Sequence, residues 1–163
     1  MTAVPPAIRL QPFDAADFED WRAQAIPAYA LEHVTSQTWS VAECLVRSQE
    51  AYDALLPAGQ DTTGHSFCHI VATSSARRVG YLWWAEADAA GRAGLYVYGI
   101  EIREGERRQG YARAALNELE RVACERGLGY LSLHVFGHNT GARGLYADLG
   151  FEPTSITLRK NLD

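Results

Sequence analysis

The chain has 163 residues, of which 47% are hydrophobic and 21% are charged. This length suits one domain, and this composition supports a packed core, which excludes a disordered or collagen-like chain. The formal net charge of −5 disfavours binding to nucleic acid or anionic membranes, because both require clustered Lys and Arg. We therefore expect a single domain over residues 1–163.

The three cysteines, Cys44, Cys68 and Cys124, are widely spaced and include no C-x-x-C pair. This pattern favours reduced, buried thiols over a disulfide framework or a structural zinc site. The first residues lack the basic and apolar stretches of a signal peptide, and the sequence has no apolar run long enough to span a bilayer. We expect a cytoplasmic protein with no membrane partner and no metal.

The negative charge is concentrated in the N-terminal third of the chain. Residues 1–60 contain eight acidic and three basic residues, a net charge of −5, whereas residues 61–163 contain twelve of each. Two interpretations stay open. The acids either lie on solvated helix faces or line a site for a cationic partner.

In chain order, the first predicted elements are one strand and two helices. The strand covers residues 7–11, and Asp14 follows it as the N-cap of a helix. Pro27 lacks a backbone donor and is expected to end or kink that helix. Ser40 and Glu43 have the spacing of a capping box, so a second helix is predicted from Ser40 to near Pro57. Its predicted apolar face consists of Val41, Cys44, Leu45, Ser48, Tyr52 and Leu55.

The middle of the chain is rich in β-branched and aromatic residues. Three runs, over residues 67–72, 79–87 and 95–103, are separated by turn sequences and predict an antiparallel meander. Gly99 interrupts the third run. A glycine in that position is typical of a β-bulge or of a close approach by another backbone or a ligand.

The last third of the chain alternates between helical and extended patterns. A helix is predicted from Ala112 to Gly127, a strand over residues 130–136, a helix over 140–149 and a last strand over 151–158. A meander followed by this alternation predicts an α/β (α+β) fold, with a mixed, mostly antiparallel sheet and helices packed on it.

Residues 100–113 are predicted to contain the end of a strand, a short turn and the start of a helix, in this order. The first backbone N–H groups of a helix have no intrahelical partner and carry partial positive charge, so they can hold a phosphate group. Arg107 and Arg108 add full positive charge there, while Gly110 and Ala112 leave the amides accessible. The segment matches neither a Walker loop nor a G-x-G-x-x-G fingerprint.

Two motifs in this part of the chain resemble those of the GNAT superfamily of N-acetyltransferases. Residues 107–112, RRQGYA, are similar to its pyrophosphate motif Q/R-x-x-G-x-G/A. Residues 139–151, NTGARGLYADLGF, match the pattern N-x-x-A-x-x-x-Y-x-x-x-G-F, which is the more specific of the two. The resemblance covers residues 79–159. It implies a GNAT fold, in which the middle strands splay apart and helices cover both faces of the sheet.

The resemblance also implies acetyl-CoA as the acyl donor and coenzyme A as a product. Backbone groups of Ile100 and Ile102 are then expected to bind the pantetheine arm. Asn139 is expected to bond a pantetheine amide, Ala142 to leave room for it, and Tyr146 to donate a proton to the departing thiolate. A core tyrosine is the alternative interpretation of Tyr146. The pyrophosphate is expected to bind Arg107, Arg108, Gln109, Gly110, Tyr111 and Ala112.

The implied acceptor is an amine, either a small molecule or a peptide. An alkyl amine is neutral only about once in 2,000 at pH 7, so its attack requires a base. The acidic N-terminal third favours a cationic acceptor, such as a polyamine, an aminoglycoside or a peptide N-terminus. Residues expected near the acceptor are Tyr29, Glu32, Trp39, Trp83 and Trp84.

Glu101 is the candidate base, because it is the only acid inside the splayed strand. In a regular strand it points away from the face of Ile100 and Ile102, although a bulge at Gly99 could re-aim it. A surface or structural acid is the alternative. Several GNAT members carry a glutamate earlier in this strand, where this chain has Tyr96.

Other functions are open to the same sequence. One alternative is a non-catalytic acyl-CoA-binding sensor or scaffold, and another is an acyltransferase of this fold that uses a donor other than acetyl-CoA. His134 and His138 have no third ligand at metal spacing, and the cysteines have no histidine partner at short range. A homodimer is compatible with the sequence.

Overall fold

The computed structural model describes residues 5–162, and within this range five strands form one sheet that helices cover on both faces. The single domain predicted over residues 1–163 stays a prediction, because Met1–Val4 and Asp163 lie outside the described residues. In chain order, the elements are β1 (Ile8–Pro12), α1 (Ala15–Thr35), α2 (Cys44–Leu55), η1 (Gly59–Asp61), β2 (His65–Ala72), β3 (Arg78–Ala89), β4 (Arg92–Ile102), η2 (Glu104–Glu106), α3 (Tyr111–Glu125), β5 (Leu131–Leu133) and α4 (Thr140–Asp148), where η marks a short 3-10 helix.

The sheet has the strand order β1-β2-β3-β4-β5. The first four strands form an antiparallel meander, whereas β5 pairs parallel to β4. Ala90 and Gly91, which join β3 to β4, have φ angles of 53° and 75°. Two left-handed residues in succession are typical of the tight turn that a right-handed sheet twist favours. The mixed, mostly antiparallel sheet predicted from the sequence is confirmed.

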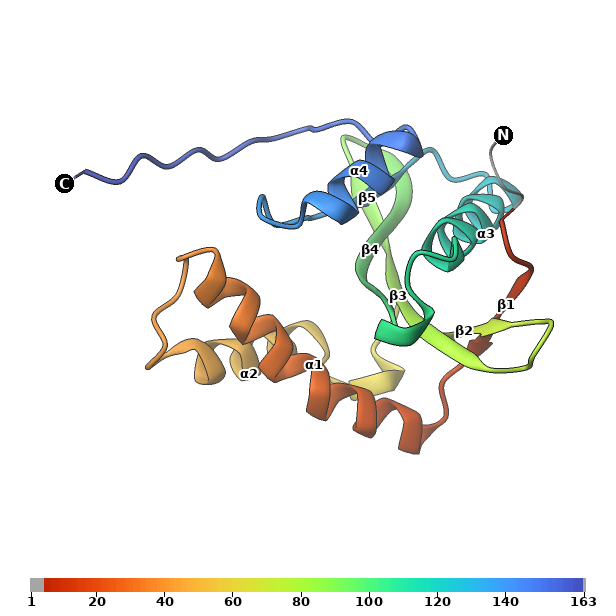
Figure 1. Cartoon of the computed structure of the whole chain (residues 1–163), viewed down its shortest axis with the longest axis horizontal. Helices are drawn as coiled ribbons and strands as arrows, with labels where there is room; N and C mark the ends of the chain where they lie inside the picture. Colours follow the sequence, from red (N-terminus) through yellow and green to blue (C-terminus); the bar gives the residue numbers. More distant parts are fainter. Residues whose placement is uncertain (1–4, 163) are drawn as a thin grey trace.

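Each face of the sheet has its own hydrophobic core (Figure 1). On one face, Leu82 and Leu95 pack with Leu116 and Leu119 of α3, and residues of α4 cover the edge of this cluster. On the other face, Trp21 of α1 meets Phe67 of β2 and Trp83 of β3 at ring-centroid distances of 5.1 Å. The prediction of helices on both faces is confirmed.

Asp14 caps α1, as its position in the sequence predicts. Its side chain accepts a hydrogen bond from the Asp17 N–H at 2.8 Å, and the Asp17 carboxylate accepts one from the Asp14 N–H at 3.3 Å. Asp17 also pairs with Arg78 at 2.6 Å and with His69 at 2.9 Å. Partial burial raises the pKa of Asp17, but the hydrogen bonds from His69, the Asp14 backbone and Arg78 outweigh it and lower the pKa overall. One carboxylate thus joins the start of α1 to β2 and β3.

Pro27 does not end its helix, which rules out one of the two effects predicted for it, an end or a kink. α1 continues through it to Thr35. Next to the proline, the buried Ser48 hydroxyl of α2 donates a 2.7 Å hydrogen bond to the Ile26 carbonyl. Packing against α2 therefore supplies a polar contact beside the position where the proline removes a backbone donor.

The second helix begins later than the sequence predicts. Ser40 donates its hydroxyl proton to the Glu43 carboxylate at 2.7 Å instead of accepting a backbone N–H, and α2 begins at Cys44. Val41 and Leu45, placed on the apolar face by their spacing, are 77% and 57% exposed. Val41 lies before the first turn of the helix, whereas Leu45 lies in that turn but on its solvent side, so neither residue reaches the core.

The C-terminal end of the chain departs furthest from the prediction. The strand predicted over residues 151–158 is absent, and residues 152–162 are extended, exposed and without a strand partner in the described chain. The preceding strand, β5, is also shorter than its predicted range of 130–136. An extended segment becomes a strand only when another strand pairs with it, which a single-strand pattern cannot reveal.

Three features of the described residues bear on disulfides, metals and membranes: the cysteines, the possible metal ligands and the apolar character of the helices. Cys44, Cys68 and Cys124 are free, and only Cys68 is buried, so the expectation of buried thiols is wrong for the exposed Cys124. Within residues 5–162 there is no group of three or more His, Cys, Asp or Glu that could hold a metal ion. In the same range, no helix has the length and apolar character to cross a membrane.

We predict that Asp17→Asn lowers the free energy of unfolding by about 1–2 kcal/mol at pH 7. The pKa of Asp17 is depressed by folding, so its contribution is complete above the unfolded pKa of about 3.9 and is lost as the pH falls through the folded pKa. Urea denaturation should therefore separate variant from wild type at pH 7 and not at pH 3. Asp20→Asn, an exposed acid on the same helix, is the control and should change little.

Candidate functional site

β4 and β5 pair over only three residues and then separate. The pairs are Leu95 with Leu131, Tyr96 with Ser132, and Val97 with Leu133. β4 continues to Ile102, whereas the chain after Leu133 forms no further pair with it in the described residues. β4 and β5 thus splay apart beyond Val97, as the resemblance led us to expect.

A β-bulge lies at the start of the open stretch. Trp84 of β3 pairs with Val97, and Trp83 pairs with Gly99, so Tyr98 is an extra residue in β4. The bulge reverses the alternation of side chains along the strand. Val97 and Ile100 therefore both face the α3 side, as their shared core cluster shows.

The bulge places Glu101 on the α1 side of the sheet. Glu101 pairs in register with Tyr81, which packs in the core that α1 and α2 cover. Burial, together with the nearby charge of Glu101, raises the pKa of Tyr81 to about 12. Without the extra residue, Glu101 would point into the apolar core under α3, on the side of Leu95 and Val97. The bulge is confirmed, one residue before Gly99, but Glu101 still alternates with Ile100 and Ile102.

Backbone groups of Ile100 and Ile102 point into the gap between β4 and β5. The Arg103 N–H donates to the Val79 carbonyl of β3 at 2.8 Å. Since successive residues of a strand alternate in direction, the N–H and C=O groups of residues 100 and 102 face the opposite edge. The Arg107 guanidinium donates to the Ile102 carbonyl there at 3.0 Å.

The turn between β4 and α3 leaves a row of backbone donors free. Arg108 and Gly110 have φ angles of 63° and 88°, and α3 begins directly after Gly110. In the part of the chain that the structure describes, none of the N–H groups of residues 108–113 donates a hydrogen bond. A helix start with unpaired N–H groups after left-handed residues is suited to an anion.

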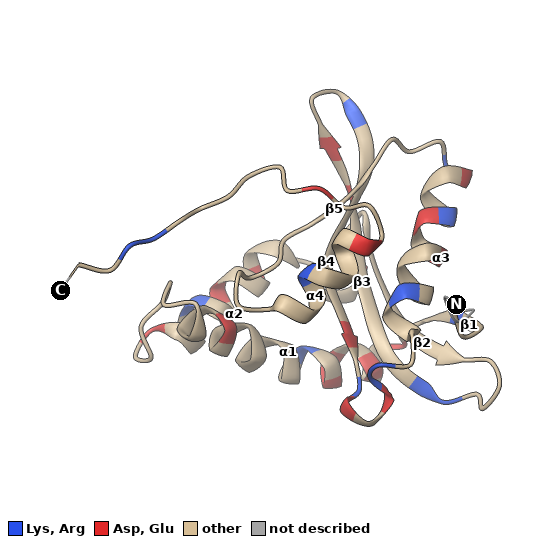
Figure 2. Ribbon diagram, turned by 45° about the horizontal axis from the view of Figure 1, so that its top comes forward, with Lys and Arg blue, Asp and Glu red and all other residues tan. Residues whose placement is uncertain are grey.

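Several side chains in this turn contact other groups of the protein. Arg107 lies 4.0 Å from the Glu101 carboxylate, and the Gln109 amide donates to the Gly105 carbonyl at 3.4 Å. Glu106, which is buried, pairs with Arg77 of the β2–β3 turn. Charges of both signs gather around this turn (Figure 2). The side chains of Arg107 and Gln109, predicted as anion ligands, are thus partly engaged with the protein itself.

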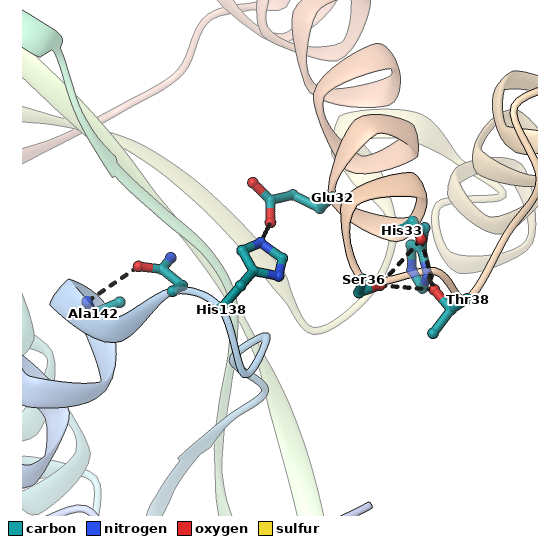
Figure 3. A network of polar contacts seen from close by, with 7 residues as sticks. Glu32, His33, Ser36, Thr38, His138 and Ala142 are labelled. Carbon is teal, nitrogen blue, oxygen red and sulfur yellow. Dashed lines mark hydrogen bonds and ion pairs between the residues drawn. The ribbon is translucent and has the colours of Figure 1, made fainter. Parts of the chain in front are cut away.

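α4 borders the gap on the side of β5. Asn139 is its N-cap and accepts a 3.2 Å hydrogen bond from the Ala142 N–H (Figure 3). The Asn139 side-chain oxygen is therefore engaged, while its amide nitrogen makes no hydrogen bond to residues 5–162. Ala142 lies one turn further along the helix.

Tyr146 packs at the edge of the core cluster that also contacts Ile100, Tyr111 and Ala112. The structure therefore gathers residues of β4, α3 and α4 on one side of the sheet. The ring of Tyr146 lies 5.6 Å from that of Phe151, and its hydroxyl has no hydrogen-bond partner within the described range. Burial raises the pKa of Tyr146, which keeps the phenol protonated at neutral pH.

The C-terminal half of α1 faces the segment after β5. Glu32 pairs with His138 at 2.6 Å, across 106 positions of sequence (Figure 3). His33 stacks on Trp39 at 3.7 Å and lies 5.1 Å from the ring of Phe136. This polar and aromatic group lies on the same side of the sheet as Tyr29.

The residues expected near the acceptor lie in three different places in the structure. Tyr29, Glu32 and Trp39 belong to the group beside the β5–α4 segment. Trp83 is buried in the core under α1, and Trp84 is buried on the opposite face, in the core of α3. Successive strand residues alternate between faces, so the two tryptophans cannot share one pocket.

His33 is a candidate site residue that the sequence did not indicate. Burial, followed by the nearby His134, lowers its pKa, so the imidazole is neutral at pH 7. Its Nδ1 lies 2.6 Å from the Thr38 hydroxyl, while its buried Nε2 has no partner in the described chain. Its neighbours Tyr29, Thr38 and Trp39 are close in sequence, but its contacts with Phe136 and His134 depend on the fold.

Comparison with known proteins identifies the family. A family model described as the Acetyltransferase (GNAT) family matches residues 19–151. The chain belongs to the GNAT acetyltransferase family. This GNAT protein is 33% identical over 156 residues to the uncharacterized N-acetyltransferase YdgE of Bacillus subtilis (strain 168), which covers 96% of this chain and 99% of the relative. It is an acyltransferase enzyme by this membership.

Solved structures agree with the fold. The crystal structure of YycN, an uncharacterized N-acetyltransferase of the same bacterium, aligns with a TM-score of 0.89 and 31% identity over 96% of this chain and 99% of that chain. A candidate acetyl transferase from Pyrococcus furiosus aligns with a TM-score of 0.66 at 20% identity, again over 96% and 99% of the two chains. At that identity the similarity concerns the fold alone.

Proposed function

We propose that this GNAT enzyme transfers an acetyl group from acetyl-CoA to an amine by direct attack. The observation that carries the proposal is the gap beside β4. Backbone groups of Ile100 and Ile102 point into it, and the free N–H groups of residues 108–113 lie just beyond the end of the same strand. An extended amide-containing arm with a diphosphate at one end has the matching chemistry.

The free N–H groups of residues 108–113 hold the diphosphate in this proposal. They sit at the start of α3, where the partial positive charge of the helix favours an anion. Arg108 is exposed and adds a full charge, whereas Gly110, which lies next to Pro6, adds no side chain beside the amides. Because Arg107 is bonded to the Ile102 carbonyl, its role is to fix the turn as well as to supply charge.

The rest of the donor binds along β4 and α4. Ile100 and Ile102 pair with the pantetheine amides in the manner of a strand, and the Asn139 amide nitrogen is free to donate a hydrogen bond. Ala142 leaves space for the arm. In this proposal, a backbone N–H near Ile102 stabilises the negative charge that develops on the thioester oxygen, which is the usual means of accelerating acyl transfer.

Tyr146 is the proposed proton donor to the departing thiolate. Its phenol is protonated at neutral pH, as in any tyrosine of ordinary or raised pKa, and its hydroxyl is free of other hydrogen bonds within residues 5–162. The side chain packs beside Ile100 and Ala112, on the cluster that borders the gap. These observations favour the catalytic role over that of a fully buried core tyrosine.

Two residues are candidates for the base. Glu101 is exposed on the α1 side of β4, close to the gap. His33 is a neutral imidazole whose buried Nε2 lacks a partner in the described chain, on the far wall of the same region. We propose Glu101 as the base, since it lies on the strand that binds the donor.

A cationic amine is the proposed acceptor. Fewer acids support this proposal than the net charge of −5 over residues 1–60 implies. Most contacts of the N-terminal acids are with nearby basic groups, such as Asp53 with Arg22 and Glu43 with Arg47. Glu32 is the acid of this third that reaches the β5–α4 segment. Beside it, Tyr29 and Trp39 offer aromatic faces, which attract cations.

The direct test is thiol release from acetyl-CoA in the presence of a panel of amines. We expect release with polyamines, aminoglycosides or peptide N-termini to exceed release with neutral acceptors and to fall with rising salt. Binding of acetyl-CoA without release for any amine would favour the sensor or scaffold alternative. Release only from longer acyl thioesters would favour a different donor.

We predict that Gly110→Glu abolishes acetyl-CoA binding, measured by calorimetry. The new carboxylate repels the diphosphate, and the left-handed φ of 88° and the 3.0 Å approach of Pro6 leave the side chain little freedom. Gly110→Ala separates backbone strain from charge and should weaken binding less. Gly105→Glu adds the same charge in the same turn without a steric clash, and it should bind almost normally.

Tyr146→Phe is expected to lower kcat about 100-fold while the Kd for acetyl-CoA stays within about twofold. The change removes the phenol hydroxyl, and with it the proton to be donated, but preserves the packing of the ring against Phe151. Tyr130→Phe, a half-buried tyrosine beside Gly94, is the matched control and should leave kcat unchanged. Normal turnover of Tyr146→Phe would remove this residue from the mechanism.

Glu101→Gln and His33→Gln distinguish the two candidate bases. We expect Glu101→Gln to lower kcat at least about 100-fold, and His33→Gln to lower it only a few fold. If His33 were the base, the opposite order would hold, and wild-type kcat would rise with pH through a pKa below 6.5 and stay level above it, since the neutral imidazole is the active form. Steady-state rates from pH 5 to 9 provide the measurement.

A further inference from the structure

The outer edge of β5 has no neighbouring strand among residues 5–162. β5 is the last strand of the sheet and pairs only with β4. Leu131 and Leu133 contact the α3-side core but are only half-buried, and the adjacent helix α4 contains no buried residue. An unpaired edge bordered by half-exposed apolar side chains is a template for a further strand.

The C-terminal segment has the sequence of such a strand. Every residue from 152 to 162 is exposed, and Ile156, Leu158 and Leu162 expose 71%, 89% and 84% of their surface. These residues alternate with Thr157, Arg159 and Asn161, so an extended chain has one side that is apolar except for Lys160. Large apolar side chains in this number are normally covered by a partner.

The segment is directed away from the β5 of its own chain. The Phe151 N–H donates to the Tyr146 carbonyl at 2.9 Å, which fixes how the chain leaves α4. Pro153 then restricts itself and Glu152 to extended conformations, and residues 151–162 contain no glycine at which the chain could reverse. The segment projects from the body of the molecule (Figures 1 and 2). One hydrogen bond, from Arg159 to the Gln37 carbonyl at 2.7 Å, joins it to the α1–α2 connection.

We propose that two copies of this chain exchange their C-terminal segments, and that residues 155–162 of each copy add a strand to the β5 edge of the other. The same molecule offers both the open edge and the unpaired strand, which is the self-complementarity that a two-fold dimer requires. In this arrangement Ile156 and Leu158 cover Leu131 and Leu133 of the partner copy. The strand predicted from the sequence then forms, but between chains.

The exchange also supports the gap beside β4. β5 is held by only three residue pairs before it diverges, so its position depends on few hydrogen bonds. A second strand on its outer edge pairs β5 on both sides and extends the ordered strand toward residues 134–136. The dimer therefore holds the two strands apart at the place where the gap opens. This consequence is independent of which ligand the gap accepts.

Sedimentation of the full-length protein at micromolar concentration tests the proposal. We expect a species of twice the monomer mass of 18.0 kDa. Ile156→Asp/Leu158→Asp should raise the dimer dissociation constant at least about 100-fold, because four buried apolar side chains become charged. Thr157→Asp/Asn161→Asp adds the same charge to the other side of the strand and should leave the dimer largely intact. All four positions are exposed in the single chain, so neither variant should unfold it.

Hydrogen exchange of the amides of residues 131–136 identifies the interface. Slow exchange in the wild-type dimer and fast exchange in Ile156→Asp/Leu158→Asp support strand addition at β5. A monomer at all concentrations overturns the proposal, including a monomer whose β5 amides are protected by its own segment. A dimer that persists in Ile156→Asp/Leu158→Asp places the interface elsewhere and also overturns it.

Discussion

Three residue pairs hold β5 parallel to β4, and beyond Val97 the two strands separate. This short pairing leaves the backbone groups of Ile100 and Ile102 without a neighbouring strand on the β5 side of β4. Backbone polar groups in such a position require partners, and an extended ligand supplies them as a strand would. The site is therefore made chiefly of main chain, which explains why so few side chains have to be specified to build it.

One extra residue determines which side chains surround this main-chain site. The bulge at Tyr98 turns Ile100 and Ile102 toward the α3 core and Glu101 toward α1. The same strand can therefore pack on the core through its apolar side chains and present a carboxylate to the acceptor side. Further along the chain, the left-handed turn before α3 leaves its amides free just where β4 ends. In the proposed function, the donor and Tyr146 therefore lie on the α3 side of this strand, and the candidate base Glu101 lies on the α1 side.

The elements that the sequence predicts well are those with strong local signals. The meander, the amphipathic α3 and the Asp14 cap follow from periodicity and capping chemistry, and the two motifs point to the family. The elements that it misses depend on distant parts of the chain. α1 continues through Pro27 while Ser48 of α2 bonds the adjacent carbonyl, the half-buried His33 packs against Phe136 from beyond β5, and the segment at 151–158 has no strand partner among the described residues. Trp84 was misplaced because alternation along β3 places neighbouring tryptophans on opposite faces.

The central claim is that the main chain of β4 and of the turn before α3 binds the acyl donor. Amide hydrogen exchange, followed by NMR with and without a saturating non-hydrolysable acetyl-CoA analogue, measures this residue by residue. The account predicts added protection at residues 108–113 and at Ile100 and Ile102, with β1 and β2 unaffected. Protection confined to other segments, or binding that leaves these amides unchanged, would contradict it.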